Sequence, residues 1–433
     1  MRETDRTSIL TYQRCPREYW YSRHAGGKGL QKKSKGLPLQ FGGAFHEGCE
    51  VLLTLNPREY LCTNPPTTNV DLAVQRAHNF LRDQFDNHAI SFDNETPDDL
   101  QKAMEYGQEE QMALAEGLLR GWWSYEGEAF LENFEVIEVE QEGRATLADD
   151  LVLMFRPDAL VRDKQSGDLY VISWKTCATF QKRNIDQAKH DMQSISEVFG
   201  VEQLMGLQSA AEAQEMANKL GTSVAWGTNG TRVEGVLYRW IVKGQRRKDD
   251  WTGLYTQGSH LIYGWRKLGS SADDAEWSWS YEWKGEDVNP KTGKLVTHKL
   301  GKGWKKVPIW REYPGGVKQW ISDLSANQIF PRHIDALQAI FPQSLPVERR
   351  KDEVESWKRQ VIAQESRIDD SLMALSLGRD QEDLDYHFPQ HTNSCHSYSG
   401  CSFIPICWEN APAEVGELYQ IRSANHPEKG DDE

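Results

Sequence analysis

The sequence has no long apolar run, and this absence excludes a membrane-spanning helix. No stretch of its 433 residues approaches the ~20 apolar residues that a helix needs to cross a bilayer. The first residues, MRETDRTSIL, contain no apolar segment after their charges, so we expect no signal peptide. These absences predict a cytoplasmic protein that does not bind a membrane.

Cysteine is scarce, and no export signal accompanies it. The seven cysteines are an odd number, and in a cytoplasmic protein they predict no disulfide framework. The phosphate-binding pattern G-x-x-x-x-G-K-[ST] is absent as well. Any ATP-driven unwinding of nucleic acid must therefore come from a separate protein.

Positive charge is in deficit, since 50 Lys and Arg face 65 Asp and Glu and leave a net charge of −15. This balance argues against a uniformly basic surface for nucleic acid. The basic residues nevertheless gather in three runs, within residues 1–35, 243–248 and 291–306. Basic stripes on an acidic body suit an enzyme that must release a polyanion, although each stripe taken alone is better explained as solvated surface.

The length and composition are those of a globular protein with a substantial core. Hydrophobic residues make up 38% and charged residues 27% of the chain, and the length suggests two or three folding units. We divide the chain into an N-terminal segment 1–40, a core with a helical insert 41–266, tryptophan-rich strands followed by helices 267–380, a cysteine-rich segment 381–412 and an acidic tail 413–433.

The hydrophobic periodicity alternates along the chain between that of helices and that of strands. Helices are predicted in 8–23 with a break at Cys15-Pro16, in 41–55 with His46 in the first turns, and in 69–125, 181–217 and 347–377. Three strands are predicted within 134–176, joined by turns at 148–150 and 164–167, and a buried strand at 233–242. This order predicts an α/β fold with a mixed sheet.

Tryptophan is concentrated in one region. Residues 251–320 contain eight of them: Trp251, Trp265, Trp277, Trp279, Trp283, Trp304, Trp310 and Trp320. We predict a layer of aromatic-rich hairpins that packs on the core, in preference to a platform for stacking bases.

Two polar residues lie at strand ends, where phosphodiester chemistry would use them. Asp158 follows Arg156-Pro157 after an apolar strand, and Lys175 ends the next strand. Adjacent antiparallel strands bring such positions side by side. Phosphodiester hydrolysis uses a divalent metal held by carboxylates to activate water, and a lysine to steady the developing charge. An isolated Asp or Lys at a strand end is usually surface, but this pair predicts a site.

At these residues the chain resembles the PD-(D/E)XK nuclease superfamily, and within it the RecB-like branch of bacterial and phage proteins. That branch includes the nuclease domain of the AddB recombination subunit and the CRISPR-adaptation exonucleases. The resemblance covers most of the chain and rests on Gly42-Gly43-Ala44-Phe45-His46, Arg156-Pro157-Asp158, Trp174-Lys175-Thr176, a following glutamine helix and the cysteine pattern. It implies that residues 41–266 form a restriction-endonuclease-like core, a mixed central sheet flanked by helices, with helical additions.

The resemblance also implies a role for each matching residue. Three groups would bind Mg²⁺ or Mn²⁺: His46, Asp158 and the main-chain carbonyl of Trp174. Lys175 would be catalytic. The glutamine of the family would be Gln193 or Gln203, and we favour Gln193 because its distance from the lysine is closer to the usual spacing.

One position departs from the family, because Ser173 occurs two residues before Lys175, where the family has Asp or Glu. A serine hydroxyl is a poor Mg²⁺ ligand and carries no charge. Activity is then lost, or the serine was introduced to disable the enzyme, or a neighbouring acid substitutes. The preferred substitute is Glu140, since members of the family often carry an acid on the preceding strand. Asp191 and Glu197, on the glutamine helix, are the alternatives.

The cysteine pattern is the second signal. Cys395, Cys401 and Cys407 have five residues between neighbours and can converge on one soft-metal centre, with Cys15 as the fourth ligand. Iron–sulfur nucleases of the RecB-like branch show the same split, so the resemblance implies a [4Fe–4S] clasp that joins the N- and C-terminal segments. Zinc, with His391 or His396 as a ligand, is the alternative. The remaining cysteines, Cys49, Cys62 and Cys177, are interpreted as small core residues.

The predicted function is metal-dependent cleavage of DNA, from ends or on single strands, in recombination, repair or phage DNA processing. The alternative is a catalytically inactive nuclease fold that binds DNA or acts as a scaffold, and Ser173 favours it. The expected partners are DNA and a separate helicase or recombination protein.

Overall fold

A computed structural model of the chain describes residues 2–33, 35–54, 68–86, 90–91, 97–205, 233–244, 257–269, 275–326, 333–343, 345–377, 381–396, 400–409 and 418–422. The predictions for Cys62, Trp251, the helix beyond residue 205 and the tail beyond residue 422 lie outside these ranges. Within them, no helix combines the length and the apolar character needed to span a bilayer.

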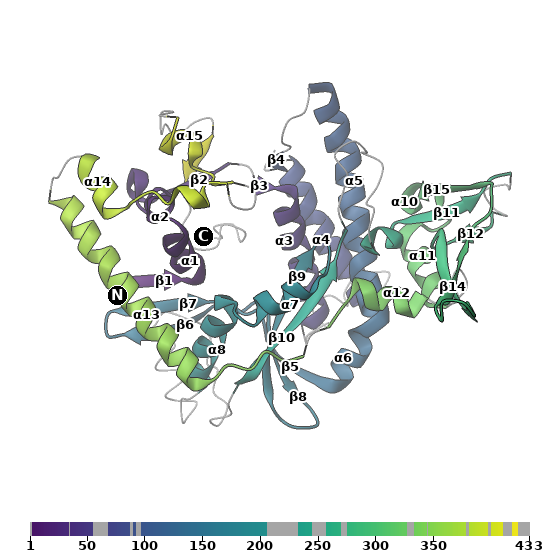
Figure 1. Cartoon of the computed structure of the whole chain (residues 1–433), viewed down its shortest axis with the longest axis horizontal. Helices are drawn as coiled ribbons and strands as arrows, with labels where there is room; N and C mark the ends of the chain where they lie inside the picture. Colours follow the sequence, from purple (N-terminus) through teal and green to yellow (C-terminus); the bar gives the residue numbers. More distant parts are fainter. Residues whose placement is uncertain are drawn as a thin grey trace.

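The core is a four-stranded mixed sheet with the strand order β10-β9-β8-β5 (Figure 1). Its strands are β5 (Phe134–Val139), β8 (Ala159–Asp163), β9 (Leu169–Cys177) and β10 (Val233–Val242). β10 runs parallel to β9, whereas the β9–β8 and β8–β5 pairs are antiparallel. β10 is buried along nearly its whole length, as its apolar sequence requires. The predicted mixed α/β fold is confirmed.

The predicted meander of three strands is wrong, because two of its strands are split. β6 (Gly143–Ala148) and β7 (Leu151–Phe155) leave the central sheet and form a second one with β1 (Arg2–Asp5), which lies parallel to β7. The first break falls at Glu140, whose φ of 50° interrupts the extended backbone. The second falls at Pro157, which has no N–H to donate and restricts the residue before it.

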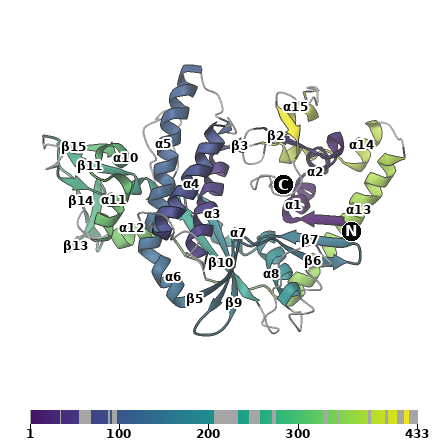
Figure 2. The same cartoon turned by 180° about the vertical axis from the view of Figure 1, so that it is seen from behind.

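Helices cover both faces of the central sheet (Figures 1 and 2). One face carries α3 (Leu37–Leu53), α4 (Asn69–Asp86), α5 (Pro97–Trp122) and α6 (Glu128–Asn133). The other side carries α7 (Lys182–Ala188), α8 (Met192–Met205) and α13 (Lys351–Ser376). Side chains alternate along β9, so that Ile172 and Trp174 pack with the first group and Val171 packs with the second.

Helix α3 begins at Leu37, four residues before the predicted start at residue 41, so His46 lies in the middle of the helix rather than in its first turns. Its neighbour Phe45 is fully buried in the core that α3 shares with the sheet. Gly48 brings α3 close to α5, because a Cβ at this position would lie 2.6 Å from the side chain of Leu119. This close packing limits the separation of α3 and α5.

A tryptophan-rich lobe lies beyond α5 (Figure 1). It consists of β11 (Tyr263–Lys267), β12 (Trp277–Ser278), the hairpin of β13 (Glu282–Val288) and β14 (Leu295–Lys299), β15 (Trp304–Pro308), α10 (Ile309–Glu312), α11 (Gly316–Ser325) and α12 (His333–Ile340). Trp279 and Trp320 are buried in the same core as α5. These two tryptophans pack in the core, as predicted for the aromatic-rich layer.

His260, in η4 (Gln257–Leu261), lies at the base of this lobe with its ring 4.8 Å from that of Trp279. Burial, together with the charge of Lys306, lowers the pKa of His260 to about 4. The unfolded chain binds a proton near pH 6.5, so this group stabilises the fold above that pH and the stabilisation is lost as the pH falls toward 4. His260→Gln should therefore reduce the loss of unfolding free energy between pH 7 and pH 4 by up to about 3 kcal/mol. Chemical denaturation at both pH values measures this.

The matched control is His190→Gln, because this histidine is exposed and lies outside the lobe. If His260→Gln loses as much stability on acidification as the wild type, the fold does not hold His260 neutral.

Segments from the two ends of the chain lie side by side (Figures 1 and 2). They comprise α1 (Arg6–Arg14), α2 (Pro16–Arg23) and β2 (Leu30–Lys32) from one end, with α14 (Gln381–His387), α15 (Ile404–Cys407) and β16 (Tyr419–Ile421) from the other. β16 pairs antiparallel with β2, and Leu30, Phe403 and Tyr419 share a small apolar core. The predicted break at Cys15-Pro16 is confirmed.

Candidate active site

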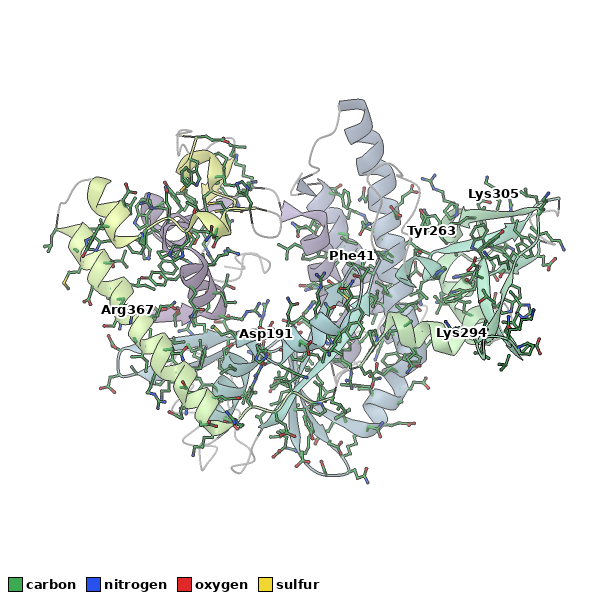
Figure 3. All side chains as sticks on the ribbon, viewed as in Figure 1. Phe41, Asp191, Tyr263, Lys294, Lys305 and Arg367 are labelled. Carbon is green, nitrogen blue, oxygen red and sulfur yellow. The ribbon has the colours of Figure 1, made fainter. Side chains whose placement is uncertain are left out.

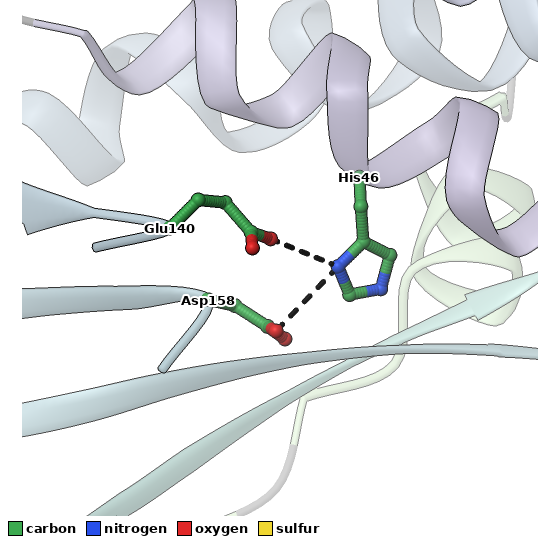
Figure 4. Close-up of side chains that lie close together, drawn as sticks. All are labelled: His46, Glu140 and Asp158. Carbon is green, nitrogen blue, oxygen red and sulfur yellow. Dashed lines mark hydrogen bonds and ion pairs between the residues drawn. The ribbon is translucent and has the colours of Figure 1, made fainter. Parts of the chain in front are cut away.

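Three side chains that could hold a divalent ion meet between α3 and the central sheet (Figure 4). His46 comes from α3, Glu140 follows β5, and Asp158 precedes β8. The Nδ1 atom of His46 lies 3.3 Å from Oε1 of Glu140 and 3.5 Å from Oδ1 of Asp158. One ligand atom from each residue lies within 4.8 Å of the other two, a spacing that one ion can bridge. Two carboxylates and an imidazole are ligand types that a divalent metal ion uses in proteins.

The backbone places the two acids next to each other. Glu140 is the one non-glycine residue of the described ranges with a positive φ, and its N–H donates to the Asp158 carbonyl oxygen at 3.1 Å. The Asp158 carboxylate accepts a bond from the main-chain N–H of Trp174 at 2.6 Å, which ties it to β9. A left-handed backbone at a residue with a Cβ costs about 1–3 kcal/mol and is typical of functional sites.

The charged groups of this site shift the pKa values of His46 and Asp158. Burial acts to lower the pKa of His46, but Asp158 and Glu140 outweigh it and raise this pKa to about 10. Burial acts to raise the pKa of Asp158, yet the charges of His46 and Lys175 keep it below its usual value. Arg156 pairs with the other Glu140 oxygen at 3.1 Å. In the metal-free protein an imidazolium therefore lies against two carboxylates, and a divalent cation can take over its charge.

Lys175 extends from the end of β9 toward α8. Its ammonium donates to the side-chain oxygen of Gln193, whose amide nitrogen donates to Glu197 at 2.6 Å. Lys175 is close enough to Asp158 for its charge to lower the pKa of that acid. Gln203, the other glutamine considered, is exposed. The structure thus brings Gln193 to the lysine and leaves Gln203 outside the site, while the roles of these residues stay predictions.

Ser173 is buried on β9, and its hydroxyl has no hydrogen-bond partner within the described ranges. The Trp174 side chain points to the other face of the sheet from Ser173 and packs in the core beneath α3. The ligand role of its main-chain carbonyl stays a prediction. Asp191, one alternative acid, lies at the start of α8 near the centre of the molecule (Figure 3). It accepts bonds from the Gln193 N–H at 2.9 Å and the Tyr238 hydroxyl at 3.3 Å. Asp191 is therefore engaged in capping α8.

Glu197, the second alternative acid, is only 3% exposed. Burial and the negative charge of Asp158 raise its pKa to about 8. Sequence reasoning ranked this residue below Glu140, because members of the family often carry an acid on the strand before Asp158. Sequence reasoning also gave Arg156 no role of its own. Its position directly before Pro157-Asp158 was the available signal.

Four cysteines line one pocket between the two terminal segments: Cys15, Cys395, Cys401 and Cys407. Two of these sulfurs accept hydrogen bonds, Cys15 from the His391 main-chain N–H at 3.4 Å and Cys407 from the Gln390 amide at 3.2 Å. All six cysteines of the described ranges are free of disulfides. Cys49 and Cys177 lie outside this pocket.

The spacing of the four sulfurs bears on the metal centre that they could hold. Four thiolates on one zinc ion, at Zn–S distances of about 2.3 Å, lie roughly 3.8 Å apart. Within the described ranges, the ligand atoms of His46, Glu140 and Asp158 all lie within 4.8 Å of one another, whereas the four cysteine sulfurs do not form such a group. Of the alternative zinc ligands, His391 directs its Nδ1 to the Arg14 carbonyl at 3.0 Å, and His396 is exposed.

The family model of the PD-(D/E)XK nuclease superfamily matches residues 6–407. The matched range begins before Cys15 and ends at Cys407, so it contains both the histidine–acid group and the cysteine pocket. No curated protein matches the chain.

Proposed function

Because the chain belongs to the PD-(D/E)XK nuclease superfamily, we propose that it is a metal-dependent deoxyribonuclease. The observation that carries this proposal is the meeting of His46, Glu140 and Asp158 at one point. Lys175 lies at the adjacent strand end, close enough to act on the charge of Asp158. Metal ligands beside a positioned ammonium suit the hydrolysis of a phosphodiester.

In this proposal the three clustered side chains hold Mg²⁺ or Mn²⁺, with the Trp174 carbonyl as a further ligand. The bound ion supplies Lewis-acid chemistry, activating water and neutralising phosphate charge. Lys175, positioned by Gln193, steadies the negative charge that develops on the phosphate oxygens. A histidine ligand together with a serine at position 173 favours Mn²⁺ over Mg²⁺.

We also propose that the cysteine pocket binds a [4Fe–4S] cluster. The shared pocket, the N–H donors to two of its sulfurs and a spacing wider than one zinc ion needs all support this. A cubane spreads its ligands, because each thiolate binds a different iron. The cluster would clasp residues 1–40 to residues 381–412, in addition to the β2–β16 pair.

We place the activity on single-stranded DNA or DNA ends, in recombination, repair or phage DNA processing. A basic run supports a nucleic-acid substrate, since residues 288–311 contain seven Lys and Arg and no acid. Lys294 and Lys305 in this run are exposed on the tryptophan-rich lobe (Figure 3). Such charges favour a polyanion. A separate helicase or recombination protein would supply unwound strands, because the sequence lacks a phosphate-binding loop.

The second candidate function is a catalytically inactive scaffold that binds DNA, and Ser173 favours it. Loss of the motif acid lowers the charge available to hold a metal. In a scaffold the fold and the cysteine pocket would persist without hydrolysis.

A cleavage assay separates the two candidates. We expect anaerobically purified protein to cut DNA with Mn²⁺ and much more slowly with Mg²⁺, and to be inactive when EDTA removes the ion. Labelled single-stranded and duplex substrates, resolved by gel electrophoresis, measure the rate. Binding of DNA without cleavage under any of these conditions would establish the scaffold.

A further inference from the structure

Glu197 is a buried acid, and only one of its two carboxylate oxygens has a hydrogen-bond partner within the described ranges. The side chain is 3% exposed, and Oε1 accepts a bond from the Gln193 amide at 2.6 Å. Oε2 is also buried and has no hydrogen-bond partner within the described ranges. A buried carboxylate oxygen without a partner is strongly unfavourable. Such an oxygen marks a position where a cation would be stabilised.

Ser173 lies on the same side of the sheet as Glu197. Side chains alternate along a strand, so Ser173 shares a face of β9 with Lys175, and that lysine reaches Glu197 through Gln193. Tyr238 is aligned with Ser173 across the β9–β10 pair and is close enough to Glu197 for the two to interact electrostatically. The Ser173 hydroxyl is likewise buried without a partner. Two unpartnered polar groups therefore lie between β9 and α8.

We propose that Glu197 supplies the metal-binding carboxylate that position 173 lacks, so that Glu197 and Asp158 face the same divalent ion. The inference rests on the proposed nuclease function. An acid at position 173 would project from β9 beside Lys175. Glu197 reaches the same face from α8, where it accepts a bond from Gln193, the partner of Lys175.

The other acids near the site are already engaged. Asp191 caps α8 and binds the Tyr238 hydroxyl. Glu140 faces His46 and pairs with Arg156, so it completes the side of the site next to α3. Glu197 is the remaining acid that could supply a ligand on the side of the site next to Lys175.

Titration of the full-length protein with Mn²⁺ in the absence of DNA, followed by calorimetry, tests this without relying on cleavage. Glu197→Gln keeps the shape and the acceptor for Gln193, and it should weaken Mn²⁺ binding by at least about tenfold. Ser173→Asp combined with Glu197→Gln should return the affinity to within about threefold of wild type. Glu202→Gln, on the same helix, should bind Mn²⁺ as wild type does.

Thermal unfolding gives a second readout. Without metal, Glu197→Gln should be at least as stable as wild type, because a neutral amide replaces a buried acid that has an unpartnered oxygen. The stabilisation that Mn²⁺ gives the wild type should be lost in the variant. A purely structural role for Glu197 would instead lower the metal-free stability. If the amide variant does not fold, Glu197→Asp keeps the charge but shortens its reach, and it should also bind Mn²⁺ more weakly.

Wild-type affinity in Glu197→Gln, or no recovery in the double variant, would overturn the inference whether or not the protein cuts DNA. Mn²⁺ binding that depends on Glu197, in a protein that cuts no DNA under any condition, would support the inference and refute the nuclease. The two proposals can therefore fail separately.

Discussion

Replacing Lys175 by alanine should lower the rate of DNA cleavage by about 10²- to 10³-fold while leaving Mn²⁺ binding nearly unchanged. The ammonium is held by Gln193 at the edge of the site and is not one of the clustered ligands. Its removal takes away stabilisation of the charge that develops during cleavage and leaves the ligands in place. Single-turnover kinetics at saturating Mn²⁺ and DNA measure the step concerned.

Lys351→Ala is the matched control. This lysine is exposed at the start of α13 and is not one of the residues assigned to the site. It should cut DNA at the wild-type rate. If Lys175→Ala has the same single-turnover rate as wild type, the lysine takes no part in the cleavage step. A parallel loss of Mn²⁺ affinity would mean that the lysine organises the ligands instead.

Changing Cys15 to alanine should abolish the proposed iron–sulfur cluster, reducing the content from about four iron and four sulfide per chain to nearly none. The brown colour of anaerobic protein should disappear with it. The melting temperature should also fall, because the free energy of binding a metal centre to folded ligands adds to the stability of the fold. The β2–β16 pair and its small apolar core would then hold the two ends alone.

Cys401→Ala should behave in the same way, since this residue lines the same pocket from the other end of the chain. Cys177→Ala is the control and should keep its iron, because Cys177 ends β9 and does not line the pocket. If the wild-type protein is colourless and contains one zinc ion per chain, the pocket binds zinc and not an iron–sulfur cluster.

The parts of the fold that follow from local patterns were predictable. The alternation of apolar residues that leads to Lys175 places β9, and the apolar run at 233–242 places β10 with its bounds. The placement of Asp158 beside the strand that carries Lys175 follows from two adjacent antiparallel strands. Helix α13 and the break at Cys15 follow from helical spacing and from proline.

The remainder depends on tertiary contacts. Glu140 adopts a left-handed backbone because its N–H bonds to Asp158, and no propensity of glutamate predicts that. The departure of β6 and β7 from the central sheet follows from this break. The orientation of Glu197 is set by the packing of α8 on β6, β7 and β10, which spacing along the chain does not define. Helix α3 begins at Leu37, although Pro38 and two glycines suggest a later start.

The pairing of the two chain ends also fixes an order of events during synthesis. A ribosome produces Cys15 380 residues before Cys395 (395 − 15 = 380), and it produces Gln31 of β2 389 residues before its partner Gln420 of β16 (420 − 31 = 389). The strands of the central sheet, which end at Val242, leave the ribosome well before these partners do. Because domains begin to fold as they emerge, the sheet forms first and the cysteine pocket closes last. If the pocket binds the proposed cluster, a cell short of iron should accumulate protein with a folded core and unpaired ends, and proteases would cleave those ends first.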